Sequence, residues 1–272
     1  MVAMLPVEPT RNLLLAALPP QELGQLTALL EQVAFTLNEP LYQANQPLSH
    51  VFFVARGMVS MVRTTGDGST VEVGPVGRDG MVGLPVFLDA GTDPLHACAQ
   101  VLPCEALRMP ARAFRAACDQ LPGLRGVMGR YTSWTVTGMA QWVACARLHE
   151  AHQRMARWLL MCHDRLNGHT LALTHEFLAQ MLGVRRPTVT LAAGMLQKAG
   201  LIHYSRGVLT ILDRAGLEQV SCECHSVSRN EYLRLLGRLP TGEATDAYNG
   251  RHGGTAGARE LRQVSNTSVE CG

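Results

Sequence analysis

The spacing of apolar residues divides the chain into regions with different periodicities. Leucines recur at helical spacing through residues 11–35, with an interruption at Pro19-Pro20, and predict short helices there. Over residues 37–110 the apolar runs are short or alternating, and glycine, proline and aspartate separate them. Helical spacing returns at Ala111 and, with brief breaks, dominates the following residues. This order predicts an α+β protein in which an antiparallel β-roll or jelly-roll domain comes first.

The β-rich region contains several runs of strand-forming residues separated by turn residues. Thr65-Gly66-Asp67-Gly68 is a strong hairpin signal, because glycine adopts the positive φ that a tight turn needs. Many short strands with glycine turns are typical of a small antiparallel barrel. The expected strands are His50–Ala55, Met58–Thr64, Thr70–Val76, Leu95–Leu102 and Ala106–Met109.

A long helix is predicted from Leu124 to about His149, after a shorter helix that starts at Ala111. It is too long and too apolar to be a solvated linker, so one of its faces must be covered. That face either packs on the barrel of the same chain or pairs with the same helix of a second copy. Its aromatic residues favour the second alternative, a homodimer, because aromatic side chains often anchor interfaces. The expected interface residues are Val127, Tyr131, Trp134, Gly138 and Trp142.

The segment from Leu173 to Leu212 has the pattern of a winged helix-turn-helix. Two short amphipathic stretches flank Gly183, which permits a sharp turn between helices that cross steeply. Thr174 is placed to cap the first helix, and Pro187 fits only in the first turn of the second. Apolar runs on either side of Ser205-Arg206-Gly207 predict a hairpin wing. The pattern indicates double-stranded DNA as the partner.

The outward, N-terminal part of the second helix is where a recognition helix presents side chains to base edges. Arg186 has the forked donors that suit guanine O6 and N7, while Arg185 and the neighbouring hydroxyls suit phosphate oxygens. Arg206 at the wing tip is expected to meet the DNA backbone. The expected DNA-binding residues are Thr174, Arg185, Arg186, Thr188, Thr190, Ser205 and Arg206.

Domain boundaries follow from these changes of pattern. We expect N-terminal helices and the β-roll over residues 1–123, and the dimerisation helix over 124–149. The winged helix-turn-helix with a final helix is expected over residues 150–238. Residues 239–272 are rich in glycine, threonine, serine and asparagine and predict a disordered tail.

Composition narrows the functional classes. In a chain of 272 residues, 47% hydrophobic residues support a sizeable core, and a net charge of +2 means that any basic patch is local. The 8 cysteines are scattered, mostly within apolar runs, which favours buried thiols in a reducing compartment. No secretory signal or long apolar span is recognisable, so we expect a cytoplasmic protein without membrane contact. Common catalytic motifs are missing too, and an enzyme is not expected.

Cys222-Glu223-Cys224-His225 is the densest group of potential metal ligands. It lies within a final helix that is expected to run from Asp213 to about Leu236. On a helix, residues two apart face in different directions, and no second pair of ligands is near in sequence. His149, His152 and His163 do not have a compact ligand spacing either. We therefore expect no metal site, although a redox or metal role of Cys222, Cys224 and His225 is left open.

The order of barrel, long helix and winged helix resembles the Crp/Fnr family of bacterial transcription regulators. The stretch LTHEFLAQMLGVRRPTVT is similar to the family's helix-turn-helix in spacing and apolar positions. Leu48–Met61 resembles the family's β-roll hairpin, with Gly57 at the turn. The resemblance implies a homodimer that binds a two-fold operator and recruits or blocks RNA polymerase.

The chain departs from the family's cyclic-AMP-responsive members at two places. Their recognition helix carries an Arg-Glu pair and a second Arg, where this chain has Arg186, Pro187 and Leu191, so a different operator is implied. Their pocket joins Gly-Glu to a downstream Arg, whereas here Leu84 replaces the glutamate and residues 79–107 contain no arginine. A cyclic phosphate in the usual pose would meet no cation, so we expect no cyclic nucleotide and predict no cofactor. The corresponding pocket residues are Val82, Gly83, Leu84, Leu95 and His96.

Two alternatives stay open on the sequence. One is a redox- or metal-sensing variant of the same regulator, in which thiols or histidines control DNA affinity. The other is a non-DNA signalling module, in which the barrel controls a helical C-terminus that docks a protein. Arg185, Arg186 and Arg206 distinguish these classes, because only a DNA-binding protein needs them for its partner.

Overall fold

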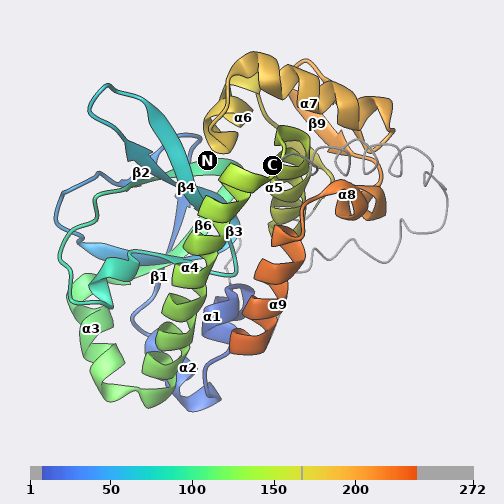
Figure 1. Cartoon of the computed structure of the whole chain (residues 1–272). Coiled ribbons are helices and arrows are strands. Elements are labelled where there is room, and N and C mark those ends of the chain that lie inside the picture. Colours follow the sequence, from blue (N-terminus) through green and yellow to red (C-terminus); the bar gives the residue numbers. More distant parts are fainter. Residues whose placement is uncertain (1–7, 167, 238–272) are drawn as a thin grey trace, which may run out of the picture. The chain divides into compact units, whose positions relative to one another are not determined.

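The computed structural model describes residues 8–166 and 168–237, which form two compact units (Figure 1). The N-terminal unit contains the described residues up to Met139 together with residues 229–237, and the C-terminal unit contains Ala140–Ser228. The boundary therefore falls inside the long helix, which differs from the three-part division expected from the pattern. No helix among the described residues is long and apolar enough to cross a membrane. The predicted disordered tail, residues 239–272, lies outside the described residues.

The N-terminal unit is built on an antiparallel sheet in the order β1-β6-β3-β4, with β2 paired to β6 and β5 paired to β3. Short helices precede this sheet, and one 3-10 turn is inserted in it. The strands are β1 (Glu31–Phe35), β2 (Pro40–Tyr42), β3 (His50–Thr64), β4 (Thr70–Val76), β5 (Met81–Val82) and β6 (His96–Pro110). The helices are η1 (Pro9–Arg11), α1 (Leu13–Ala16), α2 (Pro20–Thr27) and η2 (Leu84–Val86).

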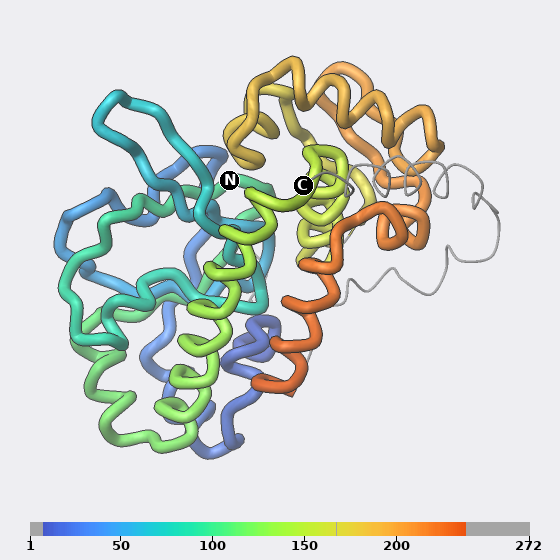
Figure 2. The backbone as a smooth tube through the Cα atoms, viewed as in Figure 1, coloured from blue at the N-terminus to red at the C-terminus, as the bar shows by residue number. Residues whose placement is uncertain are grey.

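The hairpin between β3 and β4 forms where the sequence predicts it and projects beyond the neighbouring strands (Figure 2). Asp67 organises its turn, because its carboxylate accepts hydrogen bonds from the Thr65 hydroxyl at 2.5 Å and the Ser69 amide at 3.1 Å. The hydrogen bond from Thr65 lowers the pKa of Asp67 to about 2. Gly68 supplies the expected positive φ of 83°.

The predicted strands His50–Ala55 and Met58–Thr64 form the single strand β3, and Leu95–Leu102 and Ala106–Met109 form the single strand β6. The predicted turn at Gly57 is therefore corrected. Gly57 lies at a kink inside β3, with register shifts against β6 on both sides. Its φ is 72°, and a Cβ there would lie 2.3 Å from the carbonyl oxygen of Val101. A bulge and a hairpin turn both need glycine for this backbone conformation, so the local signal is the same.

The core of the N-terminal unit lies between the sheet and its helices. Phe53 of β3 packs edge-to-face on Phe114, with ring centroids 6.1 Å apart. Asn12 is buried and connects three segments: its side chain accepts from the amide of Leu14 and donates to the carbonyls of Val54 and Gly80. The predicted helical region ends before Glu31–Phe35, which form β1 instead, because this segment pairs with β6 along its whole length.

The long helix α4 (Pro122–Leu148) follows α3 (Ala111–Gln120), close to the predicted bounds. Its inner face is part of the core of its own unit: Val127 and Tyr131 are buried, and the Trp134 ring stacks on Tyr131 at 5.8 Å. Trp134 also meets Tyr232 of α9 (Cys224–Leu236) edge-to-face at 5.1 Å. Val127 and Tyr131 therefore have no surface left for a partner, and this part of the predicted dimer interface is corrected.

The C-terminal unit consists of helices around a small antiparallel sheet in the order β7-β9-β8. Its elements, beside the ends of α4 and α9, are α5 (Ala151–Arg165), β7 (Thr170–Ala172), α6 (His175–Leu182), α7 (Arg186–Lys198), β8 (Ile202–Ser205), β9 (Val208–Ile211) and α8 (Arg214–Val220). The two helices of the helix-turn-helix, α6 and α7, and the wing strands β8 and β9 lie near their predicted positions. The predicted final helix is divided into α8 and α9 at residues 221–223. Asp213 caps α8 as predicted, by accepting a hydrogen bond from the Gly216 amide at 2.9 Å.

Candidate nucleic-acid interface

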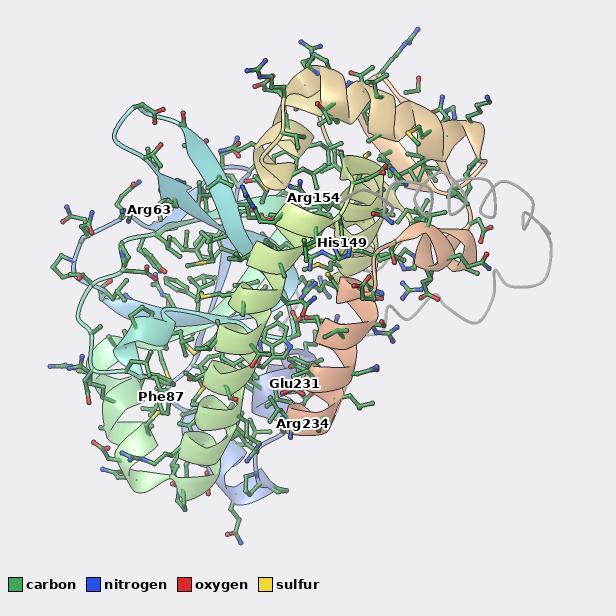
Figure 3. The ribbon with its side chains drawn as sticks, viewed as in Figure 1. Arg63, Phe87, His149, Arg154, Glu231 and Arg234 are labelled. Atoms are coloured by element: carbon green, nitrogen blue, oxygen red, sulfur yellow. The ribbon has the colours of Figure 1, made fainter. Side chains whose placement is uncertain are left out.

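The helix-turn-helix is formed by α6 and α7. The residues that the sequence predicts around its turn stabilise the conformation of that turn. Thr174 is the N-cap of α6 and accepts a hydrogen bond from the Phe177 amide at 3.1 Å. Gly183 ends α6 with a φ of 60°, a left-handed conformation that costs glycine little. Arg154, labelled in Figure 3, donates from α5 to the carbonyl of Leu182 at the end of α6. Together these contacts hold the turn in one geometry.

Helix α7 begins at Arg186, directly after its N-cap Arg185, with Pro187 in the first turn as predicted. Its inner face is apolar and fully buried in the C-terminal unit. The buried side chains of this face are Val189, Ala192, Ala193 and Leu196. Because this face is fixed, the opposite side of the helix is held towards solvent.

The outward side of α7 is basic at its N-terminus and has an apolar residue one turn later. Arg185 and Arg186 are exposed, and Leu191 is 71% exposed. The helix contains no acidic residue, and its N-terminus carries the positive end of the helix dipole. An anionic backbone and the edges of bases are the partners that such a surface attracts.

The hydroxyls predicted for DNA binding are more constrained than the arginines. Thr190 is hydrogen-bonded to Nδ1 of His175 at 3.0 Å and donates to the carbonyl of Arg186 at 3.2 Å. Thr188 is half-buried, and the Thr174 hydroxyl is engaged in its cap. The hydroxyls of Thr174 and Thr190 are therefore engaged in hydrogen bonds within the unit, which stabilise the position of the helices.

Two residues that the sequence pattern did not single out connect the recognition helix to the wing. The rings of His175 and Tyr204 stack, with centroids 4.7 Å apart and an angle of 11° between their planes. The Tyr204 hydroxyl donates to the carbonyl of Leu173 at 2.8 Å, and the Tyr204 amide donates to Gln197 of α7 at 2.7 Å. The sequence indicates this contact only by a histidine at the start of the first helix and a tyrosine in the wing strand, and neither residue type is specific for such a contact.

The wing is the two-residue hairpin between β8 and β9. Arg206 and Gly207 have φ values of 50° and 78°, and two successive positive φ values are typical of a type I′ turn. Ser205 and Arg206 are exposed at this tip, as predicted. The carbonyl of Gly207 accepts from the Leu173 amide at 2.8 Å, which joins the wing to the strand before α6.

The predicted effector-pocket residues are buried or half-buried, and the same unit contains buried acidic groups. Val82 is buried, Leu84, Leu95 and His96 are half-buried, and Gly83 has a φ of 97°. In the same unit, buried carboxylates accept hydrogen bonds from two hydroxyls: Tyr42 to Asp93 at 2.6 Å and Ser60 to Glu72 at 2.5 Å. Burial and the bond to Asp93 both raise the pKa of the Tyr42 hydroxyl.

Arg63 lies near the end of β3, and its guanidinium is engaged by a backbone carbonyl. Its side chain, labelled in Figure 3, donates to the carbonyl of Pro94 at 2.9 Å. Among the described residues of this unit, the buried charged side chains are carboxylates: Glu72, Asp79 and Asp93.

His225 is separated from the two cysteines that precede it. Its Nε2 lies 3.0 Å from Asp164, and Arg214 donates to the same carboxylate at 2.6 Å. Burial alone would raise the pKa of Asp164, but the hydrogen bond from His225 and the charge of Arg214 outweigh it and lower that pKa. Burial, together with Arg214, lowers the pKa of His163 to about 4.

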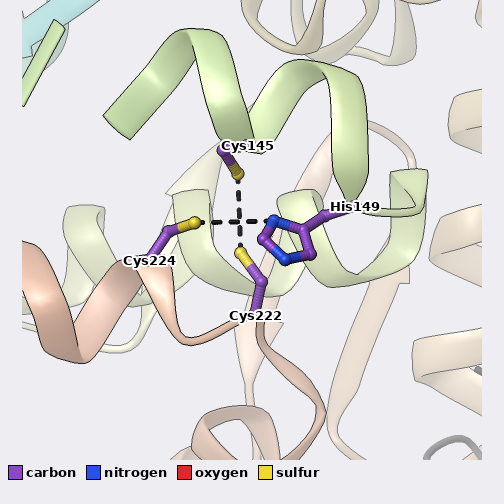
Figure 4. Close-up of side chains that lie close together, drawn as sticks. All are labelled: Cys145, His149, Cys222 and Cys224. Carbon is purple, nitrogen blue, oxygen red and sulfur yellow. Dashed lines mark hydrogen bonds between the residues drawn. The ribbon is translucent and has the colours of Figure 1, made fainter. Parts of the chain in front are cut away.

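Cys222 and Cys224 instead face Cys145 and His149 (Figure 4). Cys145 lies in the last turn of α4, and His149 directly follows that helix. The Sγ atoms of Cys145 and Cys222 are 3.5 Å apart, as are Cys224 Sγ and His149 Nδ1. The hydrogen bond between the first pair lowers the pKa of Cys145 to about 5 and raises that of Cys222. Of the three residues whose redox or metal role the sequence left open, His225 faces Asp164, while the two cysteines face Cys145 and His149, which the sequence did not connect with them.

Comparison with known proteins covers both units. The family model of the cyclic nucleotide-binding domain matches residues 32–121, and that of the Crp-like helix-turn-helix domain matches residues 153–220. The global nitrogen regulator of Synechococcus elongatus is 23% identical over 204 residues, which cover 72% of this chain and 91% of the relative. That of Nostoc sp. is 23% identical over 185 residues, covering 65% and 83%.

Solved structures show the same fold. FixK2 from Bradyrhizobium japonicum has a TM-score of 0.61 at 18% identity, covering 71% of this chain and 98% of its own. The c-di-GMP-responsive global regulator CLP from Xanthomonas campestris has a TM-score of 0.57 at 16% identity, covering 71% and 99%. With a cyclic nucleotide-binding-like barrel, a long helix and a Crp-type winged helix in this order, the chain belongs to the Crp/Fnr family of transcription regulators.

Proposed function

We propose that this regulator binds a specific DNA sequence by placing α7 in the major groove and its wing on the backbone. The observation that carries the proposal is the exposed pair Arg185–Arg186 at the N-terminus of a helix without acidic residues. Arg186 is assigned to guanine, and the 71% exposed Leu191 to the methyl group of thymine. Arg185 and Arg206 are assigned to phosphates on either side.

The operator of this chain differs from that of cyclic-AMP-responsive relatives. Pro187 has neither a side-chain donor nor an acceptor, and Leu191 offers only apolar contact. Of the three positions of α7 that contact bases in those relatives, two therefore lack polar groups in this chain. We expect an operator in which contacts to thymine methyl groups replace some of the hydrogen bonds to bases.

A second copy of the chain is proposed to cover the outer face of α4. Val136, Met139 and Val143 are 63%, 47% and 68% exposed, and their spacing of three and four residues puts them on one side of the helix. Large apolar side chains in such a row favour pairing with a copy of the same helix. A dimer of this kind presents two copies of α7, so the operator is expected to contain two half-sites about one helical turn apart.

The barrel is proposed not to bind cyclic AMP in the usual pose. Leu84 lacks the carboxylate expected to hold a ribose, and residues 79–107 contain no arginine to meet a cyclic phosphate. The buried charged side chains described in the N-terminal unit are carboxylates, which do not attract an anion. The regulator is expected to act on RNA polymerase at promoters near its operators, by recruiting it or blocking it.

Selection of genomic DNA fragments by the purified protein tests the proposal. Enriched fragments are expected to share a two-fold sequence, and footprinting is expected to show two protected half-sites. The affinity should fall with salt, with a slope that decreases by about 1 for Arg206→Ala, because one phosphate contact is lost. Arg112→Ala, an exposed arginine on α3, is the matched control and should leave the slope unchanged. If no sequence is enriched over input DNA, the proposal fails.

A further inference from the structure

Three thiols and one imidazole meet inside the C-terminal unit, away from the surface assigned to DNA. Cys145, His149, Cys222 and Cys224 place one ligand atom each within 4.8 Å of all the others (Figure 4). The three cysteines are buried, with 2%, 3% and 0% of their surfaces exposed, and His149 is half-buried. Four soft or borderline ligand atoms directed at one point have the composition of a closed zinc site.

Two of the six distances between these ligand atoms are close to those expected around one metal ion, and all six are within 4.8 Å. A tetrahedral zinc ion with its usual bond lengths separates two sulfur atoms by about 3.8 Å, and sulfur from nitrogen by about 3.6 Å. The Cys145–Cys222 and Cys224–His149 distances are both 3.5 Å. An iron–sulfur cluster instead spreads its ligands over several iron atoms, so it needs ligand atoms that surround a larger volume.

The backbone explains how residues so far apart in sequence come together. Cys145 and His149 are four residues apart at the end of α4, so their side chains leave the same side of the chain. Cys222 lies in the break between α8 and α9, and Cys224 is the first residue of α9. A continuous helix would direct Cys222 and Cys224 to different sides, whereas the break lets both face α4.

His149 is oriented as metal-binding histidines usually are. Its Nδ1 faces Cys224 Sγ, while its Nε2 lies 3.3 Å from a carboxylate oxygen of Glu223. A histidine that binds a metal through one nitrogen commonly donates from the other to a carboxylate, which fixes the tautomer and the ring. Gln141 adds a second supporting contact, because its side-chain amide donates to Cys224 Sγ at 3.0 Å.

A buried arginine supplies the charge that such a site lacks. One zinc ion with three thiolates and a neutral imidazole has a net charge of −1. Arg157 is 6% exposed, stacks on the Trp142 ring at 4.7 Å and has an Nη1 atom for which the described residues provide no hydrogen-bond partner. Its positive charge acts on both Cys145 and Cys222. A buried cation beside three cysteines is costly unless it faces negative charge.

We propose that Cys145, His149, Cys222 and Cys224 bind one zinc ion, which ties the end of α4 to the junction of α8 and α9. On binding, each thiol that is still protonated releases its proton to solvent, and the sulfur forms a bond to zinc. All four coordination positions are filled by protein, so the ion stabilises structure and leaves no open position for catalysis. The proposal is independent of DNA binding, because none of its ligands belongs to the assigned DNA surface.

Metal analysis of the full-length protein, purified under reducing conditions with zinc present, tests the proposal. Inductively coupled plasma mass spectrometry should find one zinc per chain after dialysis. Cys145→Ser and Cys224→Ser should each lower the zinc content strongly, while Cys162→Ala, a buried cysteine of the same unit outside the cluster, should retain it. Cobalt in place of zinc should give the visible absorption of a tetrahedral thiolate site, which a merely structural cluster of thiols would not produce.

A variant that keeps all four ligands separates zinc binding from folding. Glu223→Gln should bind zinc with about 10- to 100-fold lower affinity, measured by competition with a chromophoric chelator, and should fill completely at high zinc. Circular dichroism should match that of the unchanged protein. The proposal is overturned if the unchanged protein holds no zinc and takes none up, if it holds iron and sulfide instead, or if mass spectrometry finds a Cys145–Cys222 disulfide that zinc and reductant do not replace.

Discussion

The buried imidazole of His163 makes the stability of the C-terminal unit depend on pH. Its side chain is 3% exposed and lies 2.6 Å from a guanidinium nitrogen of Arg214, 2.8 Å from His169, and next to Asp164 in sequence. Burial first, and then the charge of Arg214, lower its pKa from 6.5 to about 4. Because the folded state resists protonation, the unfolded state binds more protons at mildly acidic pH.

The expected loss can be worked out from this shift. Above pH 6.5 both states are neutral at this position and there is no penalty. Between pH 6.5 and 4 the free energy of unfolding falls by about 1.4 kcal/mol per pH unit, so lowering the pH from 7 to 5 costs about 2 kcal/mol. The carboxylate of Asp164 also has a lowered pKa, but its contribution is lost only below the ordinary carboxyl range.

Urea unfolding followed by tryptophan fluorescence at pH 7 and pH 5 measures this loss. His163→Gln removes the titrating group, so the unchanged protein should lose about 2 kcal/mol more than the variant between the two pH values. Histidines that do not contact His163, and any bound metal, contribute equally to both proteins and cancel in the comparison. Equal losses in the two proteins would refute the assignment of the lowered pKa to His163.

The remaining predictions concern the bulge, the dimer and the ligand. Gly57→Ala should destabilise the protein by more than about 1 kcal/mol in thermal unfolding, because the added Cβ would meet the Val101 carbonyl. Gly66→Ala, whose Cβ would meet no described atom within 4 Å, should be close to neutral. Val136→Asp with Val143→Asp should convert a dimer to a monomer in light scattering without changing the circular dichroism spectrum, since both side chains are exposed in the single chain. A persistent dimer would contradict the proposed face. Titration calorimetry with cyclic AMP should give no binding heat, and tight binding would refute the argument from Leu84 and the absent arginine.

The helix-turn-helix was predictable because its signals are local. The cap of Thr174, the left-handed Gly183 and the helix start at Pro187 each depend on one residue's backbone preference, and the structure places all three as expected. The exposed Arg185 and Arg186 follow directly, since their position relative to the buried face of the helix is fixed by its period.

Predictions failed where a local preference fits two structures. Gly57 signals a positive φ, which a turn and a bulge satisfy equally, and only pairing with β6 decides between them. The helix face that contains Val127 and Tyr131 is buried, as its apolar pattern indicates. Periodicity does not tell whether such a face is buried against the same chain or against a second copy. The residues that remain for a partner, such as Val136 and Val143, lie on the other side of the helix.

The cysteine cluster could not be found from sequence spacing alone. Cys145 and Cys222 are 77 positions apart, so their proximity depends on the tertiary fold. The argument that Cys222 and Cys224 face apart assumed a continuous helix, and the break between α8 and α9 removes that assumption. The spacing of Cys145 and His149, four apart near a helix end, was the available signal.

The most direct test of the proposed DNA reader is the affinity of Arg185→Ala/Arg186→Ala for the operator selected from the genome. Fluorescence anisotropy at fixed salt should show a loss of about 2 kcal/mol or more, about 30-fold, because one base contact and one phosphate contact disappear. Binding to unrelated DNA should weaken less, so the ratio of specific to non-specific affinity should fall. Full operator affinity in the double variant, with its fold intact by circular dichroism, would contradict the assignment of α7 as the element that reads DNA.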